Sequence, residues 1–395
     1  MKKVVILGGG FAGLESAIWL KKYGYDVTLI SNRNYMYVYP ISIWIPTKEI
    51  NFNDATLSLR ELAEIHGFRF IQDEIQEIRS LKKEIVCKGN TYTDFDALVI
   101  ATGSGKMQHK GKENFLSICG APEESVKIGK RLDDLIEKGS GKIAFGFGGN
   151  PKDASAVRGG PAFELLFNVH NKLKKKKIRD QFELIFFAPM PKPGARMGKK
   201  ALSIMDDWFE RLNVTKYVGK KIIGFEKDGV RLEDQSKIEA DLTMFIPAGN
   251  GPDILKNSDL PLSNAGFIDI DDHCEVRFAD DAQNNDYPIF AIGDIVAIEG
   301  PDWKAKQGHV AEVMARNVAF NLREMDRGTN KRRGYQSHIN ILCVMDSGDG
   351  AALVYRDSNR EKIVPMPVVG HWMKKGWGSY FKKSKMDKMF RIPGM

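Results

Sequence analysis

The sequence lacks any apolar run long enough to cross a membrane, and it contains few cysteines. Four cysteines occur in 395 residues, and none has another cysteine at close spacing. This excludes a locally encoded zinc site or disulfide framework and is typical of a protein from a reducing cytoplasm. The start, Met1–Leu7, resembles a signal peptide, but its apolar run ends at Gly8, so we expect a strand there.

The sequence also lacks the pattern of a nucleic-acid-binding protein, although it is basic. The formal net charge is +8, and 28% of the residues are charged. Such a charge suits nucleic acid, an anionic membrane or an acidic partner. The lysines near 172–179 are expected at the solvated end of a helix, and the others concentrate in the C-terminal tail. No basic groove is apparent, so we predict no nucleic-acid partner.

Strand and helix patterns alternate from the first residue, as expected for parallel sheets covered by helices. The pattern restarts near residue 142, which indicates a second unit of the same kind. A later strand over 288–292 returns to the first unit, which is therefore discontinuous. The main predicted elements are strands over 4–7, 26–30, 95–100, 142–147, 182–187 and 242–247 and helices over 12–23 and 163–173.

The first turn has the spacing G-x-G-x-x-G at Gly8, Gly10 and Gly13, with Phe11 and Ala12 between the last two. Gly8 allows a tight turn, Gly10 allows a pyrophosphate to approach the backbone, and Gly13 allows the helix to pack on the strand. Because the N-terminus of the helix faces the phosphates, this turn predicts a dinucleotide site.

The second strand ends without the acidic residue that usually binds the ribose hydroxyls. Ser31 can still form a hydrogen bond with a ribose hydroxyl, and Arg33 can contact adenine or phosphate. Both can equally be ordinary loop residues.

Two later segments favour FAD over NAD at this site. An aspartate at the end of a strand can accept a hydrogen bond from a ribityl hydroxyl. Together with the glycine turn, these two segments form a set whose order and separations are specific, so we predict bound FAD. The residues of the later segments are Ala101, Thr102 and Gly103, and Gly293 and Asp294.

The second unit is a poor site for a nicotinamide nucleotide. The glycines around Gly146 do not have the required spacing, and Pro151 follows where a helix should start. The next strand ends in residues 187–191, which provide no carboxylate for a ribose and no arginine for a 2′-phosphate. We therefore expect a different electron donor.

Four further segments resemble a known family: Gly160–Glu164, Lys306–His309, Cys343–Asp349 and Phe390–Met395. Over essentially its whole length the chain resembles the sulfide:quinone oxidoreductases, relatives of flavocytochrome c sulfide dehydrogenase and type II NADH dehydrogenase. The resemblance implies an α/β fold with two Rossmann-like dinucleotide-binding domains and a C-terminal membrane-associating segment. The expected divisions are an FAD-binding domain over 1–115 and 265–330, a second Rossmann-like domain over 116–264, and a C-terminal domain over 331–395.

In that family two cysteines near the flavin take up sulfide sulfur, which requires a thiolate. The resemblance places Cys343 at the second redox position and Cys119 at an accessory position, whereas each can also be a small buried residue. Arg158 occupies the position of the first redox cysteine, and Ala195 that of a histidine found in some members. These two changes affect the sulfur chemistry and leave the flavin and quinone predictions intact.

The resemblance also implies roles for three residues near the cofactor. Glu164 is expected between flavin and quinone, where a raised pKa would let it pass protons, or it is a glutamate favoured by the helix dipole. Lys306 is expected over the flavin, stabilising its reduced anion, or it caps the preceding loop. Gly308, which opens the next helix, is expected at the cofactor.

The tail beyond Trp372 predicts amphipathic helices. Met373, Trp377 and Phe381 recur at four-residue steps, and lysines are expected on the opposite face. This pattern suits an interfacial helix on anionic lipid, and a dimerisation or core-capping helix is the alternative.

These observations predict a peripheral flavoprotein on the inner, cytoplasmic face of the cell membrane. It would transfer two electrons from sulfide or a related sulfur donor through FAD to a quinone. A type II NADH:quinone oxidoreductase and a catalytically altered flavoprotein of the same family are the alternatives. A homo-oligomer is compatible with the sequence.

Overall fold

The computed structural model describes residues 1–278 and 286–391. Its first sheet contains five parallel strands in the order β20-β9-β1-β2-β5. The central strands are buried on both faces, which explains their continuous apolar sequences. The strands are β1 (Lys3–Leu7), β2 (Asp26–Ser31), β5 (Arg69–Gln72), β9 (Ala97–Ile100) and β20 (Ile289–Ala291).

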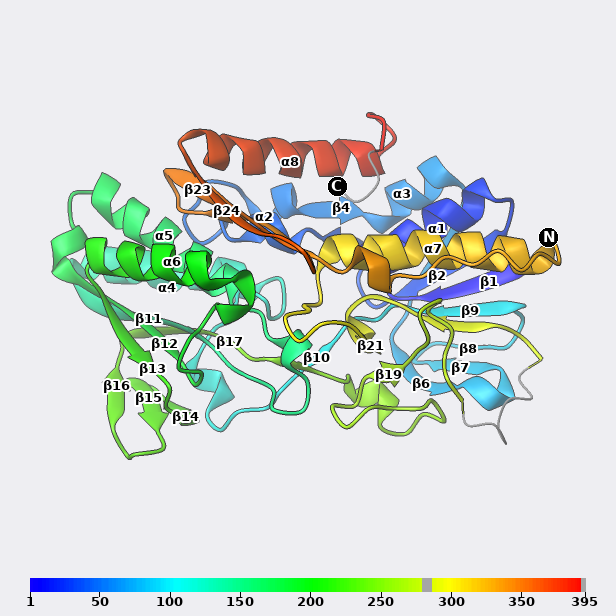
Figure 1. The fold of residues 1–395 in the computed structure, drawn as a ribbon, viewed down its shortest axis with the longest axis horizontal. Helices are drawn as coiled ribbons and strands as arrows, with labels where there is room; N and C mark the ends of the chain where they lie inside the picture. Colours follow the sequence, from blue (N-terminus) through cyan, green and yellow to red (C-terminus); the bar gives the residue numbers. More distant parts are fainter. Residues whose placement is uncertain (279–285, 392–395) are drawn as a thin grey trace.

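Helices α1 (Phe11–Lys22) and α7 (Gly308–Asp326) pack side by side against this sheet (Figure 1). Both helices are buried over much of their circumference, because α1 contacts the sheet and α7, and α7 also contacts the turn at Gly293–Ile295 that follows β20. Strand β20 pairs with β9, so the first sheet contains strands from two separate parts of the chain.

The second sheet contains four parallel strands in the order β13-β12-β11-β17. A cluster of phenylalanines fills the space between this sheet and its helices: Phe163 stacks on Phe186 at 4.8 Å between ring centroids. The strands are β11 (Gly141–Phe147), β12 (Phe182–Ala188), β13 (Val214–Val218) and β17 (Leu242–Ile246), and the helices are α4 (Glu124–Lys138), α5 (Gly160–Lys175) and α6 (Lys199–Arg211). The predicted elements are confirmed, with α5 three residues longer at its start and β9 two residues shorter.

Smaller elements connect and cover the two large sheets. The antiparallel pair of β10 (Gly105–Lys106) and β18 (Gly249–Asn250) joins the two units where the chain passes between them. The remaining elements are β3 (Tyr35–Tyr37), α2 (Tyr39–Ser42), β4 (Thr56–Ser58), α3 (Leu59–His66), β6 (Ile75–Arg79), β7 (Glu84–Cys87), β8 (Thr91–Tyr92), β14 (Ile222–Glu226), β15 (Gly229–Leu232), β16 (Lys237–Glu239), β19 (Ile268–Asp269) and β21 (Val296–Ala297).

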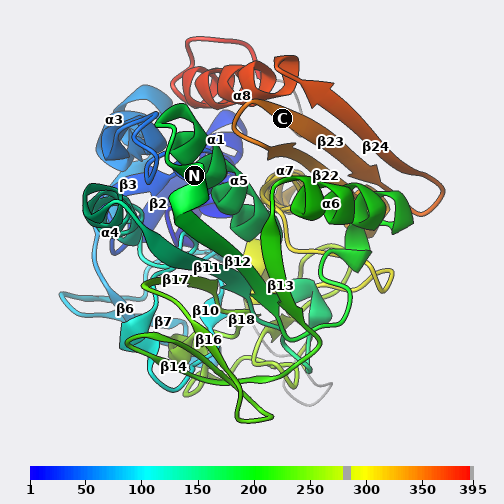
Figure 2. The ribbon, with the colours of Figure 1, turned by 90° about the vertical axis from the view of Figure 1, so that its left-hand side faces the viewer.

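The C-terminal part forms an antiparallel sheet, β22 (Ile341–Asp346), β23 (Gly350–Arg356) and β24 (Glu361–Pro367), followed by α8 (Val369–Lys385). Helix α8 runs along the edge of the molecule from this sheet toward α1 (Figures 1 and 2). In the described part of the chain no helix has both the length and the apolar character needed to cross a membrane.

The predicted division of α8 into an apolar face and a lysine face is wrong. Phe381 is 1% exposed and Trp377 packs against the core, whereas Lys374 and Lys385 are buried. The buried lysines pair with buried carboxylates on other elements, which no pattern within the tail reveals. The exposed apolar residues instead lie near the start of the helix.

Candidate functional site

The glycine turn between β1 and α1 leaves room for a ligand. Gly8 has φ +107°, and a Cβ there would collide with the carbonyl oxygen of Ala101. A Cβ on Gly13 would collide with the carbonyl oxygen of Gly8, whereas one on Gly10 would meet no atom within 4 Å. No side chain caps the N-terminus of α1. Its first N–H groups therefore face open space at Gly10, which fits a pyrophosphate.

The end of β2 lies beside this turn. Ser31 is buried, and its hydroxyl accepts a hydrogen bond from the backbone N–H of Arg33 at 3.4 Å. The guanidinium of Arg33 lies 5.7 Å from the ring centre of Tyr35. Ser31 is thus placed where the prediction needs it, and the ligand role of both residues stays a prediction.

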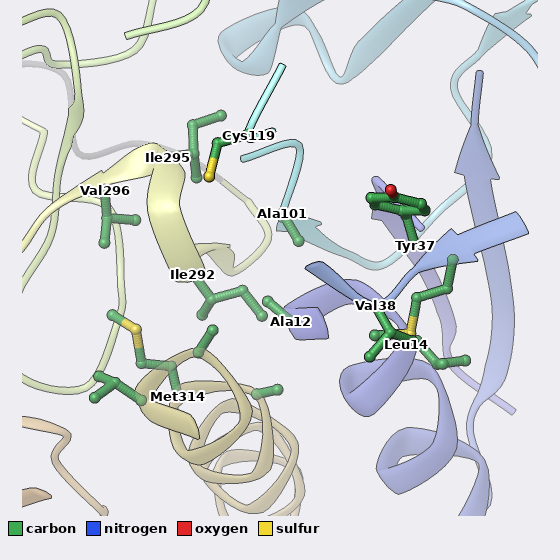
Figure 3. Packing of buried hydrophobic residues seen from close by; sticks show 14 of the residues in the cluster. Ala12, Leu14, Tyr37, Val38, Ala101, Cys119, Ile292, Ile295, Val296 and Met314 are labelled. Carbon is green, nitrogen blue, oxygen red and sulfur yellow. The ribbon is translucent and has the colours of Figure 1, made fainter. Parts of the chain in front are cut away.

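The other two predicted flavin segments meet the turn. Gly293 has φ +77°, and a Cβ there would lie 3.1 Å from the Cβ of Ala12. Figure 3 shows Ile292 directed toward Ala12 and Met314, so the segment that carries Asp294 is held against α1 and α7. Within the described residues, the Thr102 hydroxyl is shielded from solvent and has no hydrogen-bond partner. A polar cofactor would satisfy it, so this region fits FAD.

Phe11 and Gly308 close one side of the same region. A Cβ on Gly308 would lie 3.3 Å from the ring of Phe11. The ring of Phe11 also packs against the ring of Phe381 in α8, with 5.2 Å between the ring centroids. The glycine turn therefore contacts both α7 and the C-terminal helix.

Arg158 forms an ion pair with Asp294. The sequence identified Arg158 only as a replacement for a thiol, and the structure shows that its charge is directed to the predicted flavin-binding carboxylate.

Lys306 contacts the backbone of the same aspartate and is 8% exposed. Its ammonium donates to the carbonyl oxygen of Asp294 at 3.1 Å and lies 3.8 Å from the carboxylate of Asp153. Burial lowers the pKa of Lys306 well below its usual value, and the charge of Arg158 acts in the same direction. Lys306 is thus buried against the segment that carries Asp294, and its role at the cofactor stays a prediction.

The two predicted redox cysteines are held as neutral thiols. Burial raises the pKa of Cys343 to about 12, and the charge of Glu164 adds to this effect. Burial also raises the pKa of Cys119, although Lys106 and Arg158 oppose the shift. The protein therefore stabilises the neutral thiol of Cys343 near neutral pH, and not the expected thiolate.

Glu164 lies one turn inside α5 and is 4% exposed. Its carboxylate accepts a hydrogen bond from the backbone N–H of Asp346 at 2.8 Å and pairs with the ammonium of Lys374. Burial raises the pKa of Glu164, and Lys374 only partly offsets the shift. The residue is a buried acid rather than an exposed glutamate at a helix terminus.

The second glycine turn is unlike the first. Three residues (8–10) separate β1 from α1, whereas twelve residues (148–159) separate β11 from α5. A Cβ on Gly146 would lie 2.6 Å from the ring of Phe187, so this glycine serves strand packing. The helix N-terminus does not follow the turn directly, and the turn lacks the usual pyrophosphate geometry.

Sequence reasoning missed several buried charges at the C-terminal helix. Lys385 pairs with Glu15 of α1 and Glu312 of α7, and its ammonium lies 2.6 Å from Glu15 Oε2. His371 pairs with Asp346 at 2.7 Å. The sequence pointed to these buried charges only through Glu15, which interrupts the apolar stretch of α1, and it did not indicate the partner of that glutamate. The end of the last family motif, residues 392–395, lies outside the described residues.

Comparisons with known proteins agree with this geometry. The sulfide-quinone reductase of Aquifex aeolicus is 27% identical over 408 residues, covering 96% of this chain and 90% of that protein. A type II NADH:quinone oxidoreductase of Staphylococcus epidermidis is 23% identical, covering 97% of this chain and 98% of that protein.

Solved structures give the same picture. The sulfide:quinone oxidoreductase of Aquifex aeolicus superposes with a TM-score of 0.85 at 24% identity, covering 98% of this chain and 92% of that one. The NDH2 of Plasmodium falciparum in complex with NADH gives 0.77 at 15% identity, covering 98% and 99%. The model of the family described as "Pyridine nucleotide-disulphide oxidoreductase" matches residues 2–315. Because this match covers well over half of its length, the chain belongs to the pyridine nucleotide-disulphide oxidoreductase family.

Proposed function

We propose that this FAD-dependent oxidoreductase passes two electrons from sulfide or a related small sulfur donor to a quinone. The observation that supports the proposal most is the convergence of Cys343 and Glu164. Strand β22 and helix α5 pack together, and the charge of Glu164 acts on the Cys343 thiol. A thiol suited to the sulfur donor, Cys343, and a buried acid suited to the quinone, Glu164, thus lie in one region.

The residues near the predicted cofactor have different proposed roles. When bound, FAD would accept two electrons from the donor and deliver them to the quinone. Gly10 and the N-terminus of α1 would hold its pyrophosphate, and Asp294 would hold the ribityl chain. Arg158 places positive charge beside Asp294, which favours an anionic partner there, and Lys306 holds the Asp294 backbone by a hydrogen bond.

Glu164 is suited to proton transfer because its raised pKa keeps a larger fraction protonated than an exposed glutamate would have. Reduction of a quinone to a quinol consumes two protons. Lys374 would hold the Glu164 side chain in place between proton transfers.

The apolar start of α8 is proposed to dock on the membrane. Val368, Val369, Trp372 and Met373 are 62%, 67%, 67% and 40% exposed, and Phe390 is 74% exposed. Exposed Lys383 lies on the same helix. Exposed aromatic and aliphatic side chains on a helix that also carries an exposed lysine suit an anionic bilayer surface, so the proposed location is the inner face of the cell membrane. A quinone would then reach the site without crossing water.

A type II NADH:quinone oxidoreductase is the second candidate, because two relatives of that kind align over nearly the whole chain. The twelve-residue separation between β11 and α5 argues against it, since a nicotinamide nucleotide usually needs a helix directly after its glycine turn.

Anaerobic stopped-flow spectroscopy of the purified flavoprotein tests the proposal. Sulfide and NADH are mixed separately with the oxidised protein, and a short-chain quinone is added afterwards. We expect sulfide to reduce the flavin and quinone to reoxidise it. Rapid reduction by NADH with none by sulfide would establish the second candidate, and reduction by neither would indicate an altered flavoprotein.

A further inference from the structure

A row of alternating charges connects the protein surface to Glu164. Glu49, 22% exposed at its side chain, lies 3.4 Å from His371 Nε2. The other ring nitrogen, Nδ1, lies 2.7 Å from Asp346 Oδ2. Asp346 is fully buried, and its backbone N–H donates to Glu164 at 2.8 Å. The elements involved, α5, β22 and α8, are far apart in sequence.

Asp346 is held firmly between these groups. Its Oδ1 accepts hydrogen bonds from the side-chain amide of Asn168 at 3.0 Å and from the backbone N–H of Gly348 at 2.8 Å. Burial opposes its ionisation, but the contact with His371 lowers the pKa of Asp346 below its usual value. The carboxylate is therefore fixed in position and charged.

His371 is the cation that compensates Asp346. Lys374 and Lys375 of α8 lie near it, Lys375 donating to Glu49 at 2.9 Å, and the edge of the Trp44 ring faces it at 5.6 Å. Hydrogen bonds to Asp346 and then to Glu49 raise the pKa of His371 to about 9. The network therefore joins three carboxyl groups, those of Glu49, Asp346 and Glu164, to three basic side chains, those of His371, Lys374 and Lys375.

We propose that His371, acting through Asp346, is a positioning residue that controls how readily Glu164 gives a proton to the quinone. The inference rests on the proposed function. Reduction of the quinone needs two electrons and two protons: FAD, when reduced, would supply the two electrons with one proton, and Glu164 would supply the other proton and be reprotonated from solvent. His371 does not touch the quinone in this scheme.

The sign of the effect follows from the charges. Without His371, the carboxylates of Glu164 and Asp346 compete for the single ammonium of Lys374. The loss of positive charge makes ionisation of Glu164 less favourable, so Glu164 stays protonated to higher pH. Removal of the negative charge at Glu49 has the opposite effect.

The test measures reoxidation of photoreduced flavoprotein by a short-chain quinone from pH 5 to pH 10. In His371→Gln, we expect the alkaline decline in rate to move up by about 0.5 to 1 pH unit, so that the rate on this limb rises roughly three- to tenfold relative to the plateau. In Glu49→Gln, the alkaline decline in rate should move to lower pH. His66→Gln is the matched control, because His66 also contacts α8, at the carbonyl oxygen of Lys385, outside the network.

Infrared titration of the Glu164 carboxyl band, assigned with Glu164→Gln, gives a second readout that needs no turnover. We expect the band to persist to higher pH in His371→Gln. An unchanged band and an unchanged limb, or an equal shift in His66→Gln, would overturn the inference. If quinone fails to reoxidise the wild-type flavin, the proposed function fails instead, and the infrared titration still decides the role of His371.

Discussion

Replacement of Lys385 by methionine should destabilise the protein strongly. Lys385, Glu15 and Glu312 are each 2% exposed, and the lysine pairs with both carboxylates. Breaking a buried ion pair on one side typically costs about 3–5 kcal/mol. Arg391 and Arg316, the latter at 3.2 Å, still compensate Glu15, so the cost arises mainly at Glu312. We therefore expect about 3 kcal/mol, at the low end of that range.

Thermal unfolding followed by tryptophan fluorescence at a fixed scan rate measures this cost. For a chain of 395 residues, whose unfolding entropy is about 0.8 kcal/mol/K, a loss of that size corresponds to a decrease in Tm of roughly 4 °C. Lys383→Met is the matched control, because Lys383 is exposed on the same helix, and its Tm should change by about 1 °C or less. The double variant Lys385→Met, Glu312→Gln should regain about half of the loss, since it removes the unpaired charge. A Tm of Lys385→Met within about 1 °C of wild type would refute the reasoning.

Three further predictions follow from the same structure. Gly13→Val should yield protein without bound flavin, seen as loss of the visible flavin absorbance, whereas Gly376→Ala, where a Cβ meets no atom within 4 Å, should retain it. Trp372→Glu should weaken binding to anionic liposomes in a sedimentation assay by about tenfold or more, and unchanged binding would exclude this surface as the membrane contact. Although burial opposes it, pairing with Lys385 and Arg391 lowers the pKa of Glu15 to about 2. The stability that Glu15 contributes is therefore present above its unfolded pKa, about 4.3, and is lost as the pH falls toward 2. Acid unfolding should accordingly be steeper between pH 4 and pH 2 in wild type than in Glu15→Gln, and equal slopes would contradict this assignment.

The sequence predicted the parts of the fold that depend on local patterns. The turn from Gly8 to Gly13 and the buried strands were predictable because glycine spacing and apolar runs are encoded in consecutive residues. The ion pair of Arg158 with Asp294 was not predictable, since 136 positions separate the two residues and either can serve other partners.

For the C-terminal helix, the local pattern predicted the element but not the orientation of its faces. Its periodicity correctly indicated a helix, but the direction of its faces depended on where buried carboxylates lay. Lys374 looked like a surface residue because a lysine is normally solvated. Only the folded position of Glu164, 210 residues earlier in the chain, makes its burial favourable.

The contact between Phe11 and Phe381 has a consequence for biosynthesis. Domains fold as they emerge from the ribosome, amino-terminal parts first. The glycine turn is made within the first 13 residues, but the ring that packs against it arrives after 380 residues have been synthesised. The first sheet can be completed once β20 (Ile289–Ala291) has been made, while the wall behind Phe11 is completed only when α8 has left the ribosome and docked.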